Sequence, residues 1–324
     1  MARLGAPRRA AYFIPFRGCA RRCVYCDQRV ITQDASGGAP VSPDVVRREL
    51  SGASGALELC FFGGSFAKLE RGEMTELLRA VESAPNGSVV TFSSYPGDFE
   101  GTDGAALIDV LRGFPIGTIE LGVPSLDPHV LARCGRQDDP GGIKRVLTLL
   151  RDEGFRLGVQ TMIGLPGQTF ESAMSDIEEL GRVMAGGAWD LRLYPCLVLR
   201  GTELESMSRR GGYSPLGLED AARQSGALLR AAEAMGFNVI RVGLQDSPTL
   251  KRSVVGGPYH PAFGELALSE KLALELFEKN PRGPWRVEPY KISQLKGHGA
   301  RGARRLAELA SIPFRAAEAL IEAI

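Results

Sequence analysis

The strongest constraint on the fold is a regular alternation of short apolar segments with longer amphipathic ones. Six short segments rich in apolar, β-branched or aromatic residues precede residue 200: Ala11–Pro15, Leu57–Phe62, Ser88–Ser93, Ile116–Val123, Leu157–Ile163 and Leu191–Val198. Apolar residues at helical spacing occupy the stretches between them: Pro43–Gly52, Gly72–Ser83, Thr102–Arg112, Gly141–Glu153 and Phe170–Met184. Strands that alternate with helices in this way form parallel βαβ units. We therefore predict an α/β fold, a partial (β/α)6 TIM-like barrel rather than one of the usual eight units.

The pattern changes after residue 200. A long helix is expected over Leu216–Met235, followed by a possible seventh strand at Asn238–Val242, whose place in the sheet stays open. A further helix is expected over Phe263–Lys279. Three prolines then mark Asn280–Pro289 as a loop, and a last helix is expected over Ala303–Ala323, interrupted at Pro313. We predict three parts: a basic N-terminal arm (1–9), a barrel core (10–245) and a short, mainly helical C-terminal extension (246–324).

The charge balance gives little indication of a partner. The 324 residues include 39 Lys and Arg against 38 Asp and Glu, so the net charge of +1 is no argument for a nucleic acid or a membrane. Basic residues do gather at both ends, where either an anionic ligand or solvent would balance them. No apolar stretch approaches the roughly 18 residues of a membrane span, and the N-terminus has no secretory signal pattern. We expect a cytoplasmic protein without a membrane partner.

Three of the six cysteines fall within eight residues, directly after the first predicted strand. Cys19, Cys23 and Cys26 have the spacing CxxxCxxC. Thiolates bind zinc, copper(I) or iron–sulfur clusters. A zinc site normally has four ligands, so zinc would need a distant fourth residue here, whereas three ligands on a four-iron cluster leave one iron open for a small molecule. We favour the cluster. The other cysteines lack the spacing of a second cluster, although the last of them could face a substrate: Cys60, Cys134 and Cys196.

Two glycine motifs follow the ends of other predicted strands. Gly63 and Gly64 end the second strand, and Gly164-Leu165-Pro166-Gly167 ends the fifth. Paired glycines let a backbone approach a ligand closely, although a tight turn would explain them equally well. The second motif could likewise be only a turn before a helix capped by Thr169. In a (β/α) barrel these strand ends and the cysteine motif meet at the mouth, where active sites are built.

Together the three motifs, in this order, resemble the radical S-adenosylmethionine (SAM) superfamily. Within it the chain is most similar to the branch that holds the catalytic subunit of Elongator and oxygen-independent coproporphyrinogen III oxidase. The resemblance covers roughly residues 10–245. It is supported by further strings: Ile119-Glu120-Leu121-Gly122-Val123, Leu157-Gly158-Val159-Gln160, Leu193-Tyr194-Pro195 and Gly201-Thr202-Glu203-Leu204.

The resemblance implies the cofactors and the reaction. Cys19, Cys23 and Cys26 would ligate a [4Fe-4S] cluster whose open iron binds SAM. An electron from a donor such as flavodoxin or ferredoxin would cleave SAM to methionine and a 5′-deoxyadenosyl radical, which abstracts a hydrogen atom from the substrate. Because the chain has no room for the acetyltransferase domain of full Elongator subunits, we do not expect acetyl-CoA chemistry.

The resemblance also implies five contacts to SAM. Tyr25 would pack near the adenine, and Gly63 and Gly64 would offer backbone acceptors to the methionyl ammonium. Arg136 would pair with the carboxylate, for which a planar donor fork is suited, although a surface arginine is the alternative. Gln160 would face SAM from the fifth strand, where a side-chain amide without a polar partner would be costly.

Two departures from the family pattern lie near these positions. The fourth strand commonly ends Gly-Val-Gln-Ser in the family, and Pro124 replaces the glutamine here; the third often ends Ser-Thr-Arg-Pro, and Tyr95 replaces the arginine. We therefore predict a radical SAM enzyme acting on an unidentified substrate, an RNA base or a small anionic molecule, with tRNA a possible partner. The alternatives are a cluster-containing RNA-binding protein with altered catalysis and a structural zinc protein.

Overall fold

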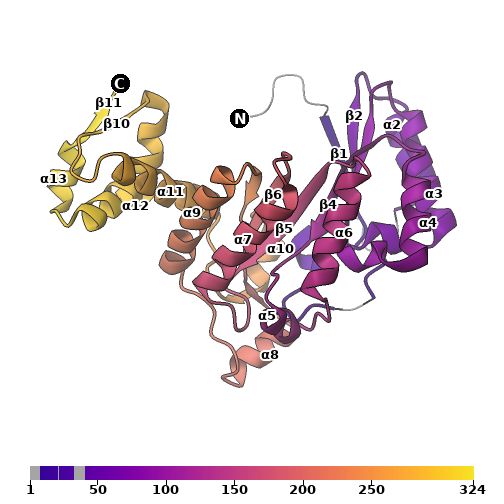
Figure 1. Cartoon of the computed structure of the whole chain (residues 1–324), viewed down its shortest axis with the longest axis horizontal. Coiled ribbons are helices and arrows are strands. Elements are labelled where there is room, and N and C mark those ends of the chain that lie inside the picture. Colours follow the sequence, from indigo (N-terminus) through magenta and orange to yellow (C-terminus); the bar gives the residue numbers. More distant parts are fainter. Residues whose placement is uncertain (1–7, 21, 33–40) are drawn as a thin grey trace.

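A curled sheet of seven parallel strands forms the centre of the computed structural model, which describes residues 8–20, 22–32 and 41–324 (Figure 1). The strands lie side by side in chain order, so each βαβ unit adds one strand to the same edge. They are β1 (Arg8–Phe13), β2 (Leu57–Phe62), β3 (Val89–Ser94), β4 (Ile116–Gly122), β5 (Leu157–Ile163), β6 (Asp190–Pro195) and β8 (Asn238–Val242). The predicted partial TIM-like barrel is confirmed, and Asn238–Val242, which the sequence left open, joins the sheet as its seventh strand.

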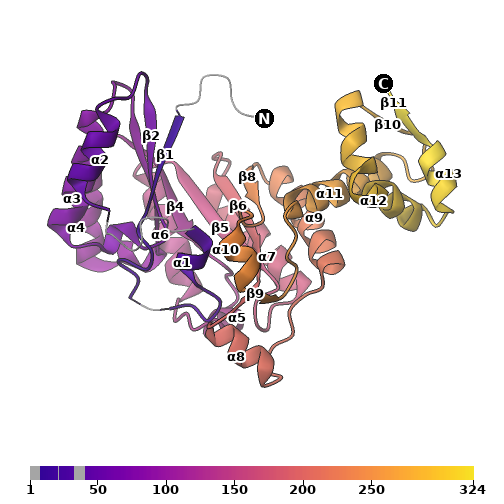
Figure 2. The same ribbon diagram turned by 180° about the vertical axis from the view of Figure 1, so that it is seen from behind.

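Helices cover the convex side of this sheet (Figures 1 and 2). They are α2 (Pro43–Leu50), α3 (Arg71–Arg79), α4 (Gly101–Leu111), α6 (Pro140–Asp152), α7 (Phe170–Met184) and α9 (Leu218–Ala234). Helix α6 illustrates the packing: Ile143, Val146, Leu147 and Leu150 recur at helical spacing and are all buried against the sheet. The main apolar core therefore lies between the strands and these helices.

The concave side of the sheet is polar, although the strand sequences are predominantly apolar. Ile119 and Leu121 of β4 are fully buried on the helix side, whereas Glu120 between them points to the concave side and is also buried. The same alternation places Gln160 of β5 and Arg192 of β6 on that side, because successive side chains of a strand point to opposite faces. The barrel therefore encloses hydrogen-bonding groups.

Four short helices that the sequence analysis missed lie around the mouth of the barrel (Figure 2). They are α1 (Gln28–Thr32), α5 (Pro128–Arg133), α8 (Glu203–Arg209) and α10 (Pro248–Ser253). Each has only five to seven residues, too few to display a helical repeat of apolar positions. A small antiparallel pair, β7 (Val198–Leu199) with β9 (Val254–Gly256), connects two of the mouth segments.

The C-terminal part extends to one side of the barrel from α11 (Phe263–Lys279), which packs against both α9 and α12 (Pro289–Ala310) (Figure 1). Its own small core includes Leu276, Trp285, Leu295 and Leu306. Helix α13 (Phe314–Ala319) and a parallel pair of strands, β10 (Trp285–Val287) and β11 (Ile321–Ala323), complete it. No helix in the described ranges is both long and apolar enough to cross a membrane.

Two sequence predictions in this part were wrong. The stretch Asn280–Pro289 is not all loop, because the buried side chains of Trp285 and Val287 form β10. The last helix does not run over Ala303–Ala323: α12 begins at Pro289, loses helical geometry at residues 297–300 and ends where Ser311 takes a left-handed conformation, with φ 54°. The interruption predicted at Pro313 is confirmed, because the chain enters α13 directly after this proline, which cannot continue a preceding helix.

Candidate functional site

The cysteine loop lies at the carboxyl ends of the strands and is held from two sides. On one side, the amide of Phe16 donates to the Gly63 carbonyl at 2.9 Å, and the amide of Ser65 donates to the Arg17 carbonyl at 2.8 Å. On the other side, Val24 donates to the carbonyl of Cys134 at 3.1 Å and accepts from the amide of Leu204 at 2.8 Å. The loop is thus fixed between the turn after β2 and the short helices α5 and α8.

The three loop cysteines are free thiols at the protein surface. Cys19 is exposed, while Cys23 and Cys26 are partly exposed. Burial, and next the neighbouring Cys23 thiol, raise the pKa of Cys26 to about 12, and the same two causes raise the pKa of Cys19. Gln28 donates from Nε2 to the Sγ atom of Cys26 at 3.3 Å. The loop therefore offers three soft thiol ligands that lie close enough to influence one another's ionisation.

This donor set, three thiols on one loop, is of the kind that can hold an iron–sulfur cluster. Within the described residues, no three or more His, Cys, Asp or Glu side chains are grouped tightly enough to hold a single metal ion. A zinc site would require such a group with a fourth ligand. A cluster of four irons is larger than a single ion, so its cysteine ligands lie farther apart. Such a cluster can be held by cysteine thiolates alone.

Glycines permit the cysteine loop and the turn after β2 to interlock. A Cβ atom on Gly18 would lie 2.0 Å from the carbonyl oxygen of Ser65, and one on Gly64 would lie 2.3 Å from that of Arg17 and 2.5 Å from that of Ile14. Gly18 and Gly63 also have positive φ, of 72° and 91°. The paired glycines therefore form a tight turn that packs against the cysteine loop, and close approach to a ligand stays a prediction.

Replacing Gly64 with alanine is expected to destabilise the protein by about 1–3 kcal/mol, because the new methyl group meets two rigid backbone oxygens. Iron retained after reconstitution should fall with it, since the loop must move. Urea unfolding and iron analysis measure the two effects. Gly55→Ala is the matched control, because a Cβ there meets nothing within 4 Å. Equal stability of the two variants would show that the interlocking does not hold the loop.

Arg136 is a buried residue and not a surface arginine. Only 8% of it is exposed. Its Nε donates to Asp138 at 2.6 Å, its Nη2 donates to the Gly122 carbonyl at 2.9 Å, and its guanidinium stacks over the ring of Tyr95 at 4.6 Å. Arg136 also interacts electrostatically with Cys23 and Tyr25. A cation is therefore fixed beside the cysteine loop, and Tyr95 is one of its supports.

Gln160 lies on the concave side, in a network that the sequence analysis did not identify. Its Nε2 donates to Glu120 at 3.0 Å and to Ser93 at 3.3 Å. Arg192 holds the same Glu120 carboxylate with two hydrogen bonds, of 2.8 and 2.7 Å. Glu120 is 2% and Arg192 9% exposed. The sequence did carry a sign of Glu120 and Arg192. Each is a charged residue that stands between two aliphatic residues within a buried strand.

Tyr25, Cys134 and Cys196 form the support behind the loop. Tyr25 packs against an apolar cluster that includes Cys134 and Cys196, and burial raises its pKa well above the ordinary value. Tyr213 in this cluster donates to the carbonyl of Gly164 at 2.6 Å. Cys134 and Cys196 are fully buried, as small hydrophobic residues commonly are, and Cys60 is buried in β2.

The turns after β4 and β5 are both fixed by side-chain hydrogen bonds. Thr169 accepts from the amide of Ser172 at 3.1 Å and caps α7, as the turn interpretation of the glycine motif predicted. Asp176 of α7 accepts from the Ser125 hydroxyl at 2.7 Å and the Leu126 amide at 2.8 Å. This holds the segment that follows Pro124. Burial raises the pKa of Asp176 to about 6 despite these bonds.

Asp176 is expected to make stability fall as the pH rises from about 4 to about 6. Its carboxyl ionises near 3.8 when unfolded and near 6 when folded, so the folded state binds an extra proton within this window. The difference of about two pH units corresponds to at most roughly 3 kcal/mol. Urea unfolding across this window should show the decline in the parent and a flatter profile in Asp176→Asn. Parallel profiles would contradict the assignment.

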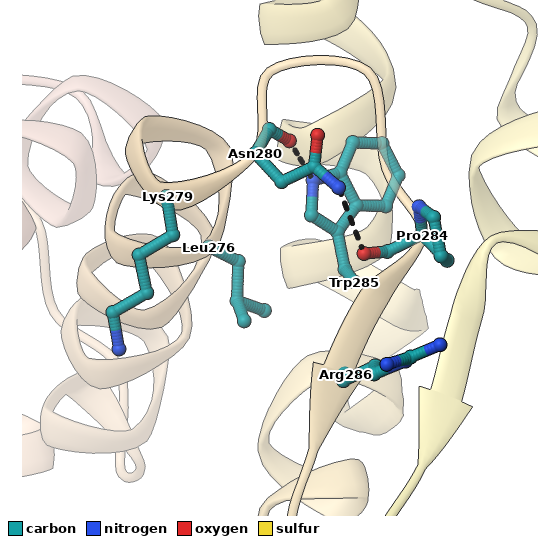
Figure 3. A pocket seen from close by; sticks show the side chains of 6 residues that line it. All are labelled: Leu276, Lys279, Asn280, Pro284, Trp285 and Arg286. Carbon is teal, nitrogen blue, oxygen red and sulfur yellow. Dashed lines mark hydrogen bonds between the residues drawn. The ribbon is translucent and has the colours of Figure 1, made fainter.

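A further pocket, of about 350 Å³, lies in the C-terminal part, on elements that do not carry the cysteine loop (Figure 3). It is lined by Leu276, Lys279, Asn280, Pro284, Trp285 and Arg286. Two hydrogen bonds join groups of its wall: Trp285 Nε1 donates to the Asn280 carbonyl at 2.9 Å, and Asn280 Nδ2 donates to the Pro284 carbonyl at 3.3 Å. The pocket is part of the fold's small second core and adds nothing to the site at the mouth.

The arrangement is matched by known families. The model of the radical SAM superfamily matches residues 13–180, and the model of the radical SAM C-terminal domain matches residues 188–273. Among solved structures, the archaeal Methanocaldococcus infernus Elp3 superposes with a TM-score of 0.56 at 20% identity, covering 85% of this chain and 64% of that one. Streptococcus suis SuiB bound to S-adenosylmethionine gives a TM-score of 0.51 at 14% identity, covering 72% and 50%. These similarities show a shared fold.

Curated relatives are similar over parts of their length. The tRNA uridine(34) acetyltransferase of Methanocaldococcus infernus is 32% identical over 103 residues, which are 32% of this chain and 19% of the relative. The heme chaperone HemW of Mycobacterium tuberculosis is 28% identical over 226 residues, which cover 64% of this chain and 54% of the relative. The chain thus spans between about a fifth and about half of these relatives.

Proposed function

The chain belongs to the radical SAM superfamily, whose members bind a [4Fe-4S] cluster and SAM, and we propose that it cleaves SAM reductively to abstract hydrogen from a substrate at the barrel mouth. The observation that carries this proposal is the CxxxCxxC loop, interlocked with the Gly63–Gly64 turn and placed beside the buried cation of Arg136. Three thiols, a close backbone turn and a fixed guanidinium are the groups needed to hold a cluster and an amino acid.

Each side chain would contribute binding or orientation. Cys19, Cys23 and Cys26 would hold the cluster, which supplies one electron to break the bond between sulfur and the 5′-carbon of SAM. Arg136, already aimed by Asp138 and the Gly122 carbonyl, would pair with the methionyl carboxylate. Such pre-organisation costs little reorganisation when the ligand binds.

The remaining contacts to SAM would also be made by groups that the fold holds in place. Gly63 and Gly64 would present backbone oxygens to the methionyl ammonium. Gln160 donates from its Nε2 to Glu120 and Ser93, so its Oε1 would be the atom that accepts from a ligand. Tyr25, packed behind the loop, would lie near the adenine.

The substrate would be an RNA base or a small anionic molecule. One curated relative is named as a tRNA uridine(34) acetyltransferase and another as a heme chaperone, which supports both classes. The electron donor would be a small redox protein such as flavodoxin or ferredoxin.

A second function is favoured by one specific observation. Tyr95 and Pro124 replace polar residues of the family pattern, and the Tyr95 ring lies under Arg136 at the site itself. A cluster-containing RNA-binding protein with altered catalysis would account for these replacements.

The experiment that separates the two functions is an assay of 5′-deoxyadenosine. The protein is purified and reconstituted with iron and sulfide without oxygen, reduced with dithionite and given SAM. The radical enzyme yields 5′-deoxyadenosine and methionine in equal amounts. A protein that holds four irons and yields neither, with or without RNA, has the altered function instead.

A further inference from the structure

Four exposed basic side chains form a patch beside the mouth, which we call the basic rim: Arg29, Arg200, Lys251 and Arg252. They come from three segments that contact one another. Helix α1, which carries Arg29, packs against α10, which carries Lys251 and Arg252 (Figure 2). The amide of Arg200 donates to the Ser253 carbonyl at 2.8 Å, directly after Arg252. The three segments that carry the rim are therefore joined directly to one another.

The rim adjoins the proposed site. Arg29 is three residues beyond Cys26, Arg200 is four residues beyond Cys196 at the end of β6, and α10 follows the end of β8. All three segments thus leave the carboxyl ends of the strands, as the cysteine loop does. Leu197, Leu199 and Leu250 are buried beneath the rim and fix its segments to each other.

Among the described residues no rim side chain forms an ion pair, although Asp27 and Asp246 each place a negative charge in the same segments. Asp27 accepts from the amides of Arg29 and Val30, and Asp246 accepts from the Tyr259 hydroxyl. Glu203 pairs with Arg210, and Glu205 pairs with Arg209. Four positive charges therefore face solvent together, although the chain as a whole carries only +1.

We propose that the basic rim binds the phosphate backbone of an RNA substrate and so presents one of its bases to the mouth. Charges spread over three segments suit several phosphates at once, whereas a small anion would be held inside the barrel. Three of the four are arginines, whose planar forks match phosphate oxygens. The proposal rests on the proposed function in one respect only, because it takes the reactive site to lie beside the rim.

The test compares RNA binding by two triple variants of the reconstituted protein. Arg200→Gln/Lys251→Gln/Arg252→Gln removes three charges from the rim but leaves Arg29, next to the cysteine loop, in place. Lys279→Gln/Arg282→Gln/Lys296→Gln removes three exposed charges from the C-terminal part. Fluorescence anisotropy with a labelled RNA hairpin, without SAM or dithionite, gives the affinity at several salt concentrations.

The rim variant should bind the hairpin at least about tenfold more weakly at low salt, and its plot of log affinity against log salt should be shallower by about 2, at about 0.7 per lost contact. The C-terminal variant should bind as the parent does. Equal loss in both variants, loss only in the C-terminal variant, or binding to phosphatidylserine vesicles in place of RNA would overturn the proposal.

Because binding is measured without turnover, this outcome does not depend on whether SAM is cleaved. Release of 5′-deoxyadenosine without RNA, measured separately, should be the same in the rim variant and the parent. A protein that cleaves SAM yet binds RNA independently of the rim refutes the rim alone. A protein that binds RNA through the rim yet cleaves no SAM refutes the proposed function alone.

Discussion

Replacing Cys23 with alanine is expected to abolish cluster binding and, with it, all SAM cleavage. Two thiolates remain on the loop, and the cluster requires three, so reconstituted iron should fall from about four per chain to near zero. The fold should persist, because Cys23 is partly exposed and the loop is anchored through the backbone of Val24. Iron and sulfide analysis, the visible absorbance of the cluster and 5′-deoxyadenosine release measure the effect.

Cys60→Ala is the matched control for this variant. Cys60 lies buried in β2, outside the loop, so its loss removes one thiol without touching the three proposed ligands. It should retain the parent's iron content. An equal loss of iron in both variants would mean that Cys23 acts through stability. Full iron in Cys23→Ala would mean that the cluster is held elsewhere.

Replacing Arg192 with methionine is expected to destabilise the protein by about 3–5 kcal/mol. The change leaves the carboxylate of Glu120, which is 2% exposed, without its ionic partner inside the barrel. Gln160 would then be the main remaining partner of that carboxylate. Urea unfolding of parent and variant at neutral pH measures the cost.

The double variant Glu120→Gln/Arg192→Met tests the cause. A neutral amide at position 120 needs no counter-ion, and replacing both members of a buried pair is often nearly neutral. The double variant should therefore regain most of the stability that Arg192→Met loses. The double variant could instead lose as much stability as the two single variants lose together. That result would show that packing of the Arg192 guanidinium over the ring of Phe62, at 5.5 Å, is the larger effect.

Much of the fold follows from the sequence because parallel strands bury one face against helices. Leu57–Phe62 and Leu157–Ile163 were predicted with the bounds they have, and Phe170–Met184 likewise. Such segments are long enough to display their period and are bounded by turn residues. The cysteine loop was placed correctly at the strand ends, because the spacing of its thiols is local in the chain.

The remainder depends on contacts between distant segments. Arg136 could be taken for a surface residue because two of its supports, Gly122 and Tyr95, come from the ends of other strands. Glu120 and Arg192 are 72 residues apart, so only the folded sheet brings them into one pair. The elements β10 and β11 were missed for the same reason. Each has only three residues, so it can be identified as a strand only through its pairing with the other.

The proposed function requires that the three loop cysteines hold a four-iron cluster whose remaining iron binds SAM. Electron paramagnetic resonance of the reduced, reconstituted protein, recorded with and without SAM labelled with nitrogen-15 at the methionyl amino group, tests it most directly. We predict that SAM shifts the signal and that electron–nuclear double resonance detects the labelled nitrogen coupled to the cluster. A four-iron signal that SAM leaves unchanged, with no coupling to the label, would contradict the account.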